Sequence, residues 1–248
     1  MKIPVIRGLI DRRMLINFRV DPALLRPLLP APFRPKLVQG HGMAGICLIR
    51  LKRVRPWFWP VPIGISSENA AHRIAVEWEQ AGELREGVFI PRRDTSSRLN
   101  ACAGGRLFPG EHHHARFEVR EQQEHYSLRL TSDDNHTRLF VAGHVADELH
   151  PGSVFGTLAA ASEFFAHGSL GYSVTSRAGH YDGLELRTFH WSLQPLAMET
   201  IESSYFDCRE RFPPGAIEFD SALLMRGLEH EWHGREPICC ATGEGDSS

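Results

Sequence analysis

Lysine is scarce in this chain of 248 residues. Only Lys2, Lys36 and Lys52 are lysines, so the other 25 of its 28 basic residues are arginines. The 30 acidic residues bring the formal net charge to −2, and without an excess of positive charge the composition argues against a nucleic-acid partner. Because the arginine guanidinium stays charged and is a poor nucleophile, the chain offers few amines for covalent chemistry.

A long hydrophobic run is also missing. No stretch approaches the roughly 20 apolar residues that span a bilayer, and the opening residues Met1-Lys2-Ile3-Pro4 lack the features of a signal peptide. We therefore expect a cytoplasmic protein without a membrane partner. The five cysteines contain no C-x-x-C motif, so we expect reduced thiols, although the adjacent pair Cys239-Cys240 could also bind a metal or be oxidised.

The residues that are present have globular proportions, with 42% hydrophobic and 23% charged. These values exclude a disordered chain, a collagen-like repeat and a disulfide mini-scaffold. Neither an internal repeat nor a convincing linker interrupts the sequence. We predict one domain over residues 1–240, followed by a small polar tail at 241–248 that we expect to be disordered.

Apolar and polar residues alternate along much of the chain, and this period of two is typical of half-buried strands. The last two of the clearest segments predict a hairpin in which Phe117 lies opposite Leu128 and Arg120 opposite His125, because that register matches every apolar pair. The segments are residues 14–20, 73–79, 115–120 and 126–130.

Helical signals are fewer. Asp21-Pro22 predicts a short helix that Pro27 ends. A second helix is expected from Asp94 towards Ala103, and the strongest runs from about Ser153 to His167 with Gly168 as its stop. Many strands, few helices and no regular βαβ alternation predict an α+β fold that is mainly antiparallel β.

Short motifs follow one another over residues 12–233, nearly the whole chain. They are Val20-Asp21-Pro22-Ala23-Leu24-Leu25-Arg26-Pro27-Leu28-Leu29-Pro30, Ser97-Arg98-Leu99, Leu170-Gly171-Tyr172-Ser173, Trp191-Ser192-Leu193-Gln194-Pro195-Leu196, Ser203-Ser204-Tyr205-Phe206, Asp220-Ser221-Ala222-Leu223-Leu224-Met225-Arg226 and His230-Glu231-Trp232. In this order they resemble the YqjF-like family of uncharacterised conserved proteins, which is related to acetoacetate decarboxylase. The resemblance implies a strongly bent sheet that forms a cone or barrel around an internal cavity, and a homo-oligomer.

In the decarboxylases that the chain resembles, a lysine forms a Schiff base with the substrate while a second lysine lowers its pKa. The comparable stretch here is Gly105-Arg106-Leu107-Phe108-Pro109-Gly110-Glu111, and three histidines rather than lysines follow it. No lysine occurs beyond Lys52. We therefore expect a small-molecule cavity without imine chemistry, and no cofactor.

The segment Ser66-Ser67-Glu68-Asn69-Ala70-Ala71 resembles the decarboxylase loop that carries a cavity carboxylate, which would place Glu68 there as an acid/base. Arg73, on the next strand, and Arg106 are candidate anion ligands, because an arginine beside a glutamate can hold a carboxylate while the glutamate transfers protons. The alternative is an ordinary surface ion pair.

Other polar residues give weaker signals. His112 and His114 share one face of an extended segment, and the hairpin register places Asp133 opposite His112, so the three could form a facial metal site. The alternative is a polar strand end that binds no metal. Glu163 interrupts an apolar helix and reaches either solvent, an arginine or the cavity. Trp57 and Trp59 could line an apolar mouth of the cavity or simply pack.

Taken together, these features predict a small-molecule cavity protein. The first hypothesis is an enzyme that acts on a small carboxylate or carbonyl compound. A binding module without turnover uses the same cavity, and a metal-dependent hydrolase at His112 and His114 is the further alternative. Buried groups with shifted pKa values would favour the enzyme.

Overall fold

The computed structural model describes residues 4–59, 64–103 and 109–239. The expected tail at 241–248 lies outside the described residues. The helices are α1 (Pro22–Leu25), the 3-10 helix η1 (Arg26–Leu28), α2 (Arg98–Ala103) and α3 (Leu158–His167). The strands are β1 (Ile6–Val20), β2 (Arg34–Pro35), β3 (Leu37–Val38), β4 (His41–Pro56), β5 (Ile65–Gln80), β6 (Glu83–Thr95), β7 (His113–Gln122), β8 (His125–Ser132), β9 (Arg138–Val145), β10 (Leu170–Val174), β11 (His180–Thr188), β12 (Gln194–Ser203) and β13 (Ile217–Cys239).

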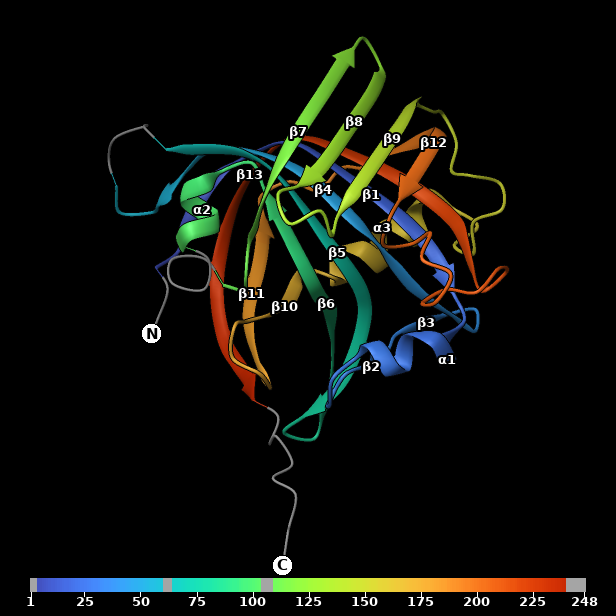
Figure 1. Ribbon diagram of the computed structural model, residues 1–248, viewed down its shortest axis with the longest axis horizontal. Coiled ribbons are helices and arrows are strands. Elements are labelled where there is room, and N and C mark those ends of the chain that lie inside the picture. The colour runs from blue at the N-terminus through green and yellow to red at the C-terminus, as the bar shows by residue number, and fades with distance from the viewer. Residues whose placement is uncertain (1–3, 60–63, 104–108, 240–248) are drawn as a thin grey trace, which may run out of the picture.

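Strand pairing closes the sheet into a ring. In order around the ring, β1 pairs with β4, β4 with β5, β5 with β6, β6 with β10, β10 with β11, β11 with β13, and β13 again with β1. Only the pairs that β6 makes with β10 and β7 are parallel among the described strands. The mainly antiparallel, ring-shaped sheet predicted above is therefore confirmed (Figure 1).

A second branch leaves the ring at β6 and returns to it at β13. The end of β6 pairs with β7, and the path continues through β8, β9 and β12 to the first part of β13. The long strand β13 therefore belongs to both the branch and the ring: its first part pairs with β12, and its later part pairs with β11. The hairpin β7–β8 rises from one end of the ring (Figure 1).

The strands β1, β4, β5 and β6 contribute to two hydrophobic cores, one on each face, and are called the shared strands below. They are apolar on both faces. Met14, Ile16 and Phe18 of β1 enter one core, and Leu15 enters the other together with Phe165 of α3. A strand that is buried on both faces reads as a nearly continuous hydrophobic run. No helix in the described part of the chain is long and apolar enough to cross a membrane.

The three predicted helices are present, but their bounds differ from the predicted ones. Asp21 caps α1 by accepting a 2.8 Å hydrogen bond from the Ala23 amide. The third helix begins at Leu158 rather than near Ser153. Ser153 instead donates to Asp220, and Gly156 has a φ of 69°, which is incompatible with a right-handed helix. Thr157 is the residue that caps α3.

The predicted hairpin exists, but its register was wrong by two residues. Phe117 lies opposite Leu130, and Gln122 rather than Arg120 lies opposite His125. A shift of two keeps every side chain on its own face, so the apolar pattern does not distinguish the two registers. The tighter turn that results places Gln123 at a φ of 53°.

Gly45 on β4 has no side chain, so residues of β1 and β5 can form a hydrogen bond across it. It pairs with Asn17 of β1 on one side and with Arg73 of β5 on the other, and Arg73 donates a hydrogen bond from Nη2 to Asn17 Oδ1 over it. A Cβ atom at this position would overlap the carbonyl oxygen of Ile16 and lie 3.3 Å from Asn17 Oδ1.

Gly45→Ala should therefore lower the free energy of unfolding by about 2–3 kcal/mol, since a methyl group is forced into a packed backbone. The matched control is Gly168→Ala, whose Cβ would meet nothing closer than 3.4 Å and should shift stability by less than about 0.5 kcal/mol. Urea denaturation of both variants measures the difference. Equal stabilities for the two variants would show that the close approach at Gly45 is not a constraint.

Candidate functional site

A small cavity lies inside the ring, on the face of the sheet that α3 covers. Its first chamber, of about 90 Å³, is lined by residues of β1, β4, β5, β6, β10, β11 and β13 and by Gly168 and Ser169. A second chamber of about 60 Å³ shares Ile49, Ala71, Arg93 and Trp232 with the first. Since one water needs a cavity of roughly 10–15 Å³, the space suits a ligand of a few non-hydrogen atoms.

Three arginines enter the otherwise apolar first chamber from neighbouring strands: Arg13 of β1, Arg73 of β5 and Arg93 of β6. Arg13 and Arg73 are buried, and Arg93 is partly buried. No aspartate or glutamate lines this chamber. In the described part of the chain, no carboxylate oxygen lies within 4.0 Å of these three guanidinium groups.

The contacts that the three arginines do make are all neutral. Arg13 Nε donates to Cys47 Sγ at 3.3 Å, and Arg93 Nε donates to Ser173 Oγ at 2.9 Å. Arg73 donates to Asn17 and lies 4.9 Å from the centre of the Phe165 ring. The positive charges are therefore held in place without being neutralised.

Burial acts directly on these charges. Desolvation lowers the pKa of Arg73 and of Arg93 to about 10, because a low-dielectric surrounding disfavours the charged form. At pH 7 both groups stay protonated. A buried cation without a partner costs several kcal/mol, and such a cost is typical of a site that a bound anion completes.

The second chamber carries groups that can exchange protons. His112, Asp94 and Asn69 line it beside Arg93. His112 Nδ1 lies 3.1 Å from the Gly110 carbonyl oxygen, so it holds the proton and donates it, which leaves Nε2 as an acceptor. Burial, and then the charge of Arg93, lower the pKa of His112 to about 4. Burial raises the pKa of Asp94 although Arg92 pairs with it.

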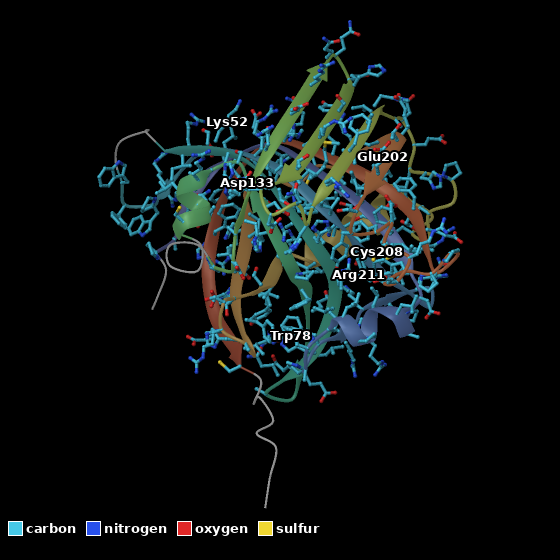
Figure 2. The ribbon with its side chains drawn as sticks, viewed as in Figure 1. Lys52, Trp78, Asp133, Glu202, Cys208 and Arg211 are labelled. Atoms are coloured by element: carbon cyan, nitrogen blue, oxygen red, sulfur yellow. The ribbon has the colours of Figure 1, made fainter. Side chains whose placement is uncertain are left out.

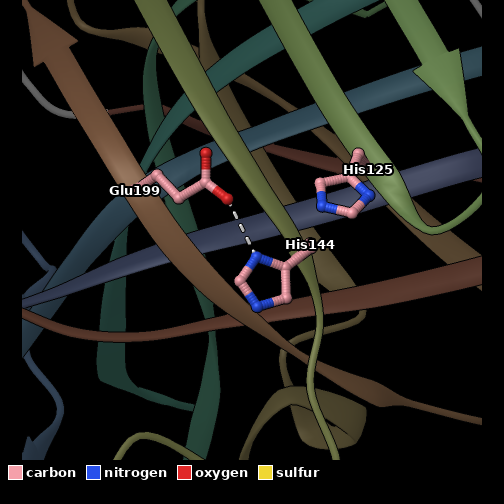
Figure 3. A group of neighbouring side chains, drawn as sticks. All are labelled: His125, His144 and Glu199. Carbon is pink, nitrogen blue, oxygen red and sulfur yellow. Dashed lines mark hydrogen bonds and ion pairs between the residues drawn. The ribbon is translucent and has the colours of Figure 1, made fainter.

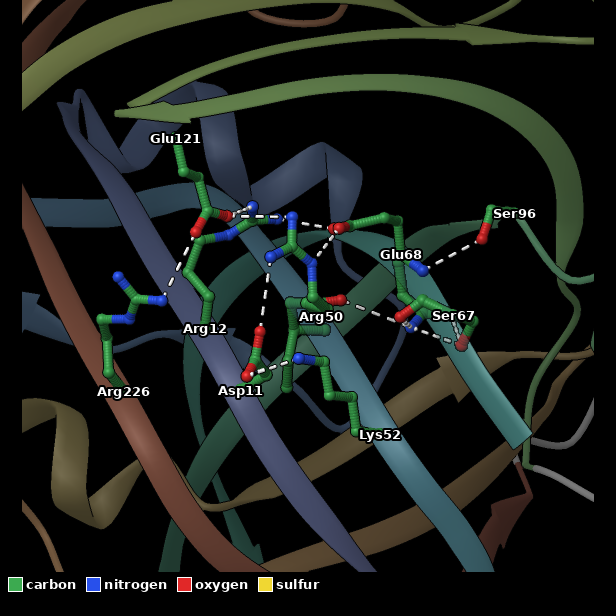
Figure 4. Close-up of polar contacts among 11 residues, drawn as sticks. Asp11, Arg12, Arg50, Lys52, Ser67, Glu68, Ser96, Glu121 and Arg226 are labelled. Carbon is green, nitrogen blue, oxygen red and sulfur yellow. Dashed lines mark hydrogen bonds and ion pairs between the residues drawn. The ribbon is translucent and has the colours of Figure 1, made fainter. Parts of the chain in front are cut away.

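Glu68 and Arg73 are not brought together. They are five positions apart on β5, so they point to opposite faces of the sheet. Glu68 accepts hydrogen bonds from the fully buried Arg12 at 2.6 Å and from Arg50 at 2.5 Å (Figure 4). Both arginines also pair with Glu121 of the hairpin β7–β8. This network fastens the hairpin to the ring and does not line the cavity.

The remaining candidates lie away from the cavity or outside the described residues. Arg106 lies outside them. Trp57 and Trp59 are more than half exposed, and Glu163 is exposed on α3. None of the three lines either chamber.

Of the three expected metal ligands, His114 and Asp133 lie together, but His112 does not join them. His112 turns inward to Gly110, whereas His114 Nδ1 lies 2.7 Å from Asp133 Oδ2 on the outside of the sheet. Among the described residues, the cluster with metal-ligand spacing is instead His125, His144 and Glu199.

The described lysines are engaged elsewhere. Lys36 pairs with Glu86 at 2.5 Å, and Lys52 pairs with Asp11 at 2.9 Å. Lys52 is nearly half exposed, and Figure 2 labels it at the end of the molecule opposite the buried Trp78. Neither lysine lines the cavity; Lys2 lies outside the described residues.

Arg13 and Arg93 are the cavity residues that the sequence reasoning missed. One signal was available for Arg13: an unbroken apolar run, Met14-Leu15-Ile16, follows it on β1, and its side chain shares the face of Leu15. A charged residue on a strand that is apolar on both faces has no solvated side to turn to. Arg93 gives no comparable signal, because Arg92 precedes it and Asp94 follows it.

Comparison with known proteins identifies the family. The DUF2071 family, described as an uncharacterized conserved protein, matches residues 10–213, so the chain belongs to it. A comparison with curated proteins finds no match.

Solved structures share the fold. An acetoacetate decarboxylase from Legionella pneumophila superposes with a TM-score of 0.61 at 12% identity, over 96% of this chain and 88% of that one. An acetoacetate decarboxylase-like enzyme from Sphingomonas wittichii gives 0.59 at 12%, over 97% and 94%. The enduracididine biosynthesis enzyme MppR, complexed with pyruvate, gives 0.60 at 11%, over 96% and 91%. At these identities the likeness shows the fold alone.

Substitution by methionine should change the free energy of unfolding in opposite directions at the adjacent residues Arg12 and Arg13. Arg13→Met removes a buried charge whose partners are only sulfur atoms, so we expect the free energy of unfolding to rise by about 1–3 kcal/mol. Arg12→Met removes one of the two arginines that pair with Glu68 and Glu121, which then keep only Arg50 in common, and it should lower the free energy of unfolding by about 1–3 kcal/mol. Chemical denaturation in low-anion buffer measures both. A loss of stability in Arg13→Met as large as that in Arg12→Met would contradict the description of Arg13 as unneutralised.

Proposed function

We propose that this DUF2071 protein binds a small carboxylate inside the ring, with Arg13, Arg73 and Arg93 as the anion ligands. The observation that carries the proposal is the convergence of three guanidinium groups, without a carboxylate partner, on one small apolar chamber. Guanidinium groups match carboxylates in shape and charge. A bound anion would supply the negative charge that the described residues lack there.

The size of the cavity and one structural neighbour support the same class of ligand. The two chambers, of about 90 and 60 Å³, suit a short-chain acid better than a nucleotide or a sugar phosphate. The neighbour MppR is described as complexed with pyruvate. A small oxo acid is therefore the first ligand to test, which agrees with the carboxylate or carbonyl compound expected from the sequence.

As an enzyme, the protein would use proton transfer and not an imine. A Schiff base requires a neutral amine in the cavity, and neither Lys36 nor Lys52 lines it. His112 instead offers Nε2 as an acceptor beside Arg93. With the carboxylate held by the arginines, His112 can remove a proton from the carbon next to the carbonyl group and return it. The bond formed and the bond broken are then a N–H and a C–H.

The same cavity without turnover would make a binding module. The two functions separate in D₂O, where an enzyme exchanges the methyl protons of pyruvate for deuterium in a manner that depends on His112, and a binder does not. A homo-oligomeric state and a cytoplasmic location also stay predictions; size-exclusion chromatography with light scattering tests the first. The separation of His112 from His114 and Asp133 gives the metal-dependent hydrolase no comparable support.

The binding proposal predicts charge-selective stabilisation. Pyruvate at 100 times its Kd should stabilise the protein by about 2.7 kcal/mol, seen as a higher Tm, whereas neutral pyruvamide should not. Arg73→Met and Arg93→Met should each weaken binding at least tenfold. Arg34→Met is the matched control, since Arg34 is about half exposed and pairs with Glu77 outside the cavity. Equal stabilisation by the neutral and the charged ligand, or undiminished binding in both cavity variants, would refute the proposal.

Anion binding should also be linked to protonation of His112. Burial, and then the charge of Arg93, lower the pKa of His112 to about 4. An anion on Arg93 offsets the second of these causes and raises the pKa of His112. Binding then takes up a proton, so affinity should increase as pH falls from 7 towards 5. Sulfate is the probe, because it remains a dianion over this range. His112→Asn should flatten the profile, and a profile unchanged by that substitution would assign the effect to Asp94 or His113 instead.

A further inference from the structure

A second site lies on the outer face of the branch β8–β9–β12. His125 of β8 pairs directly with His144 of β9, and His144 pairs with Ala197 of β12. The residues next to them, Tyr126, Val145 and Met198, turn the other way and pack into the core. The two histidines therefore stand side by side on the outside of the sheet, with ring centres 5.4 Å apart (Figure 3).

A β-bulge adds a carboxylate to this pair. The register between β9 and β12 shifts between Met198 and Thr200, so Glu199 is an extra residue without a partner in the ladder. Bulges re-aim side chains, and here Glu199 Oε1 comes to 2.9 Å from His144 Nδ1 (Figure 3). Without the bulge, β12 would have no additional residue at this position.

We propose that His125, His144 and Glu199 form a zinc-binding site. One ligand atom from each residue lies within 4.8 Å of the others. Zinc with bonds of about 2.0–2.2 Å needs its ligand atoms roughly 3.3 Å apart. Side-chain rotations that move each ligand atom by about 1 Å or less therefore complete the site. His144 and Glu199 are about half exposed, which leaves them free to rotate.

The donor set selects the ion. Two imidazoles and one carboxylate suit zinc, whereas magnesium and calcium prefer oxygen ligands throughout. Three protein ligands leave the fourth position to water, as in open zinc sites. A metal bound at His144 Nδ1 would take the place of the hydrogen bond to Glu199, and the ring proton would move to Nε2.

A bound ion would join three adjacent strands of the branch that β13 closes. Its binding free energy adds to stability because the three ligands come together only in the folded sheet. The site faces away from the arginine cavity, so the inference is independent of the proposed function. Loss of either one leaves the other intact.

The experiment is a zinc titration of tag-free, chelator-treated protein, followed by isothermal titration calorimetry and Tm. We expect one zinc per chain and a higher Tm. His125→Asn and His144→Asn should each weaken zinc binding at least tenfold. Glu199→Gln keeps the shape of the side chain and should weaken it by a similar or smaller factor. These side chains lie on the surface, so circular dichroism should show that all three variants fold.

Two controls exclude zinc bound elsewhere. His41→Asn changes an exposed histidine remote from the cluster and should leave the affinity within twofold. His180→Asn removes a histidine–cysteine pair, in which His180 Nδ1 lies 3.0 Å from Cys239 Sγ, and should also leave the zinc affinity unchanged. Cobalt(II) should give a visible d–d spectrum that His144→Asn abolishes. No zinc binding by the wild type, or binding that both His125→Asn and His144→Asn retain, would overturn the proposal.

Discussion

The interior of the closed sheet holds three positive charges that no carboxylate of the described residues neutralises. Each guanidinium group is held by neutral contacts: Arg13 by sulfur, Arg93 by Ser173 and Arg73 by Asn17. These contacts orient the charges and leave their attraction for an anion available. One unpaired buried charge costs several kcal/mol, whereas the free energy of unfolding of a whole domain is only about 5–15 kcal/mol. The surrounding apolar strands must therefore offset this cost.

The closed sheet makes this arrangement possible. In the shared strands β1, β4, β5 and β6, one face fills the core of the β7–β12 branch and the other face surrounds the cavity. Side chains alternate between the two faces, so neighbours in the sequence enter different environments. Arg12 enters a network of carboxylates, and Arg13 enters the cavity. One step along the chain thus separates a structural arginine from a candidate ligand residue.

This alternation also explains how much could be predicted from the sequence. A period of two identifies the strands, whereas the ring was predicted only from the resemblance of the motifs to a known family. That period does not fix register where two pairings preserve the same faces, which is why the hairpin around Phe117 and Leu128 shifted by two. Nor does it show which face of β5 is the cavity. Glu68 and Arg73 are close in sequence, yet only the position of α3 and β10 decides that Arg73 faces inward.

His112 shows why the chemistry of the site depends on three-dimensional surroundings. In sequence it is one of three consecutive histidines, which suggests a metal site. In the structure the carbonyl oxygen of Gly110 fixes its tautomer, and burial next to Arg93 lowers its pKa to about 4. Its neighbour His114 faces Asp133 on the outside. A histidine that is neutral at pH 7 can accept a proton, and an anion that offset the charge of Arg93 would raise the pKa of His112. In the proposed function Arg93 therefore has two roles: it attracts the anion together with Arg13 and Arg73, and its charge is one of the causes of the low pKa of His112.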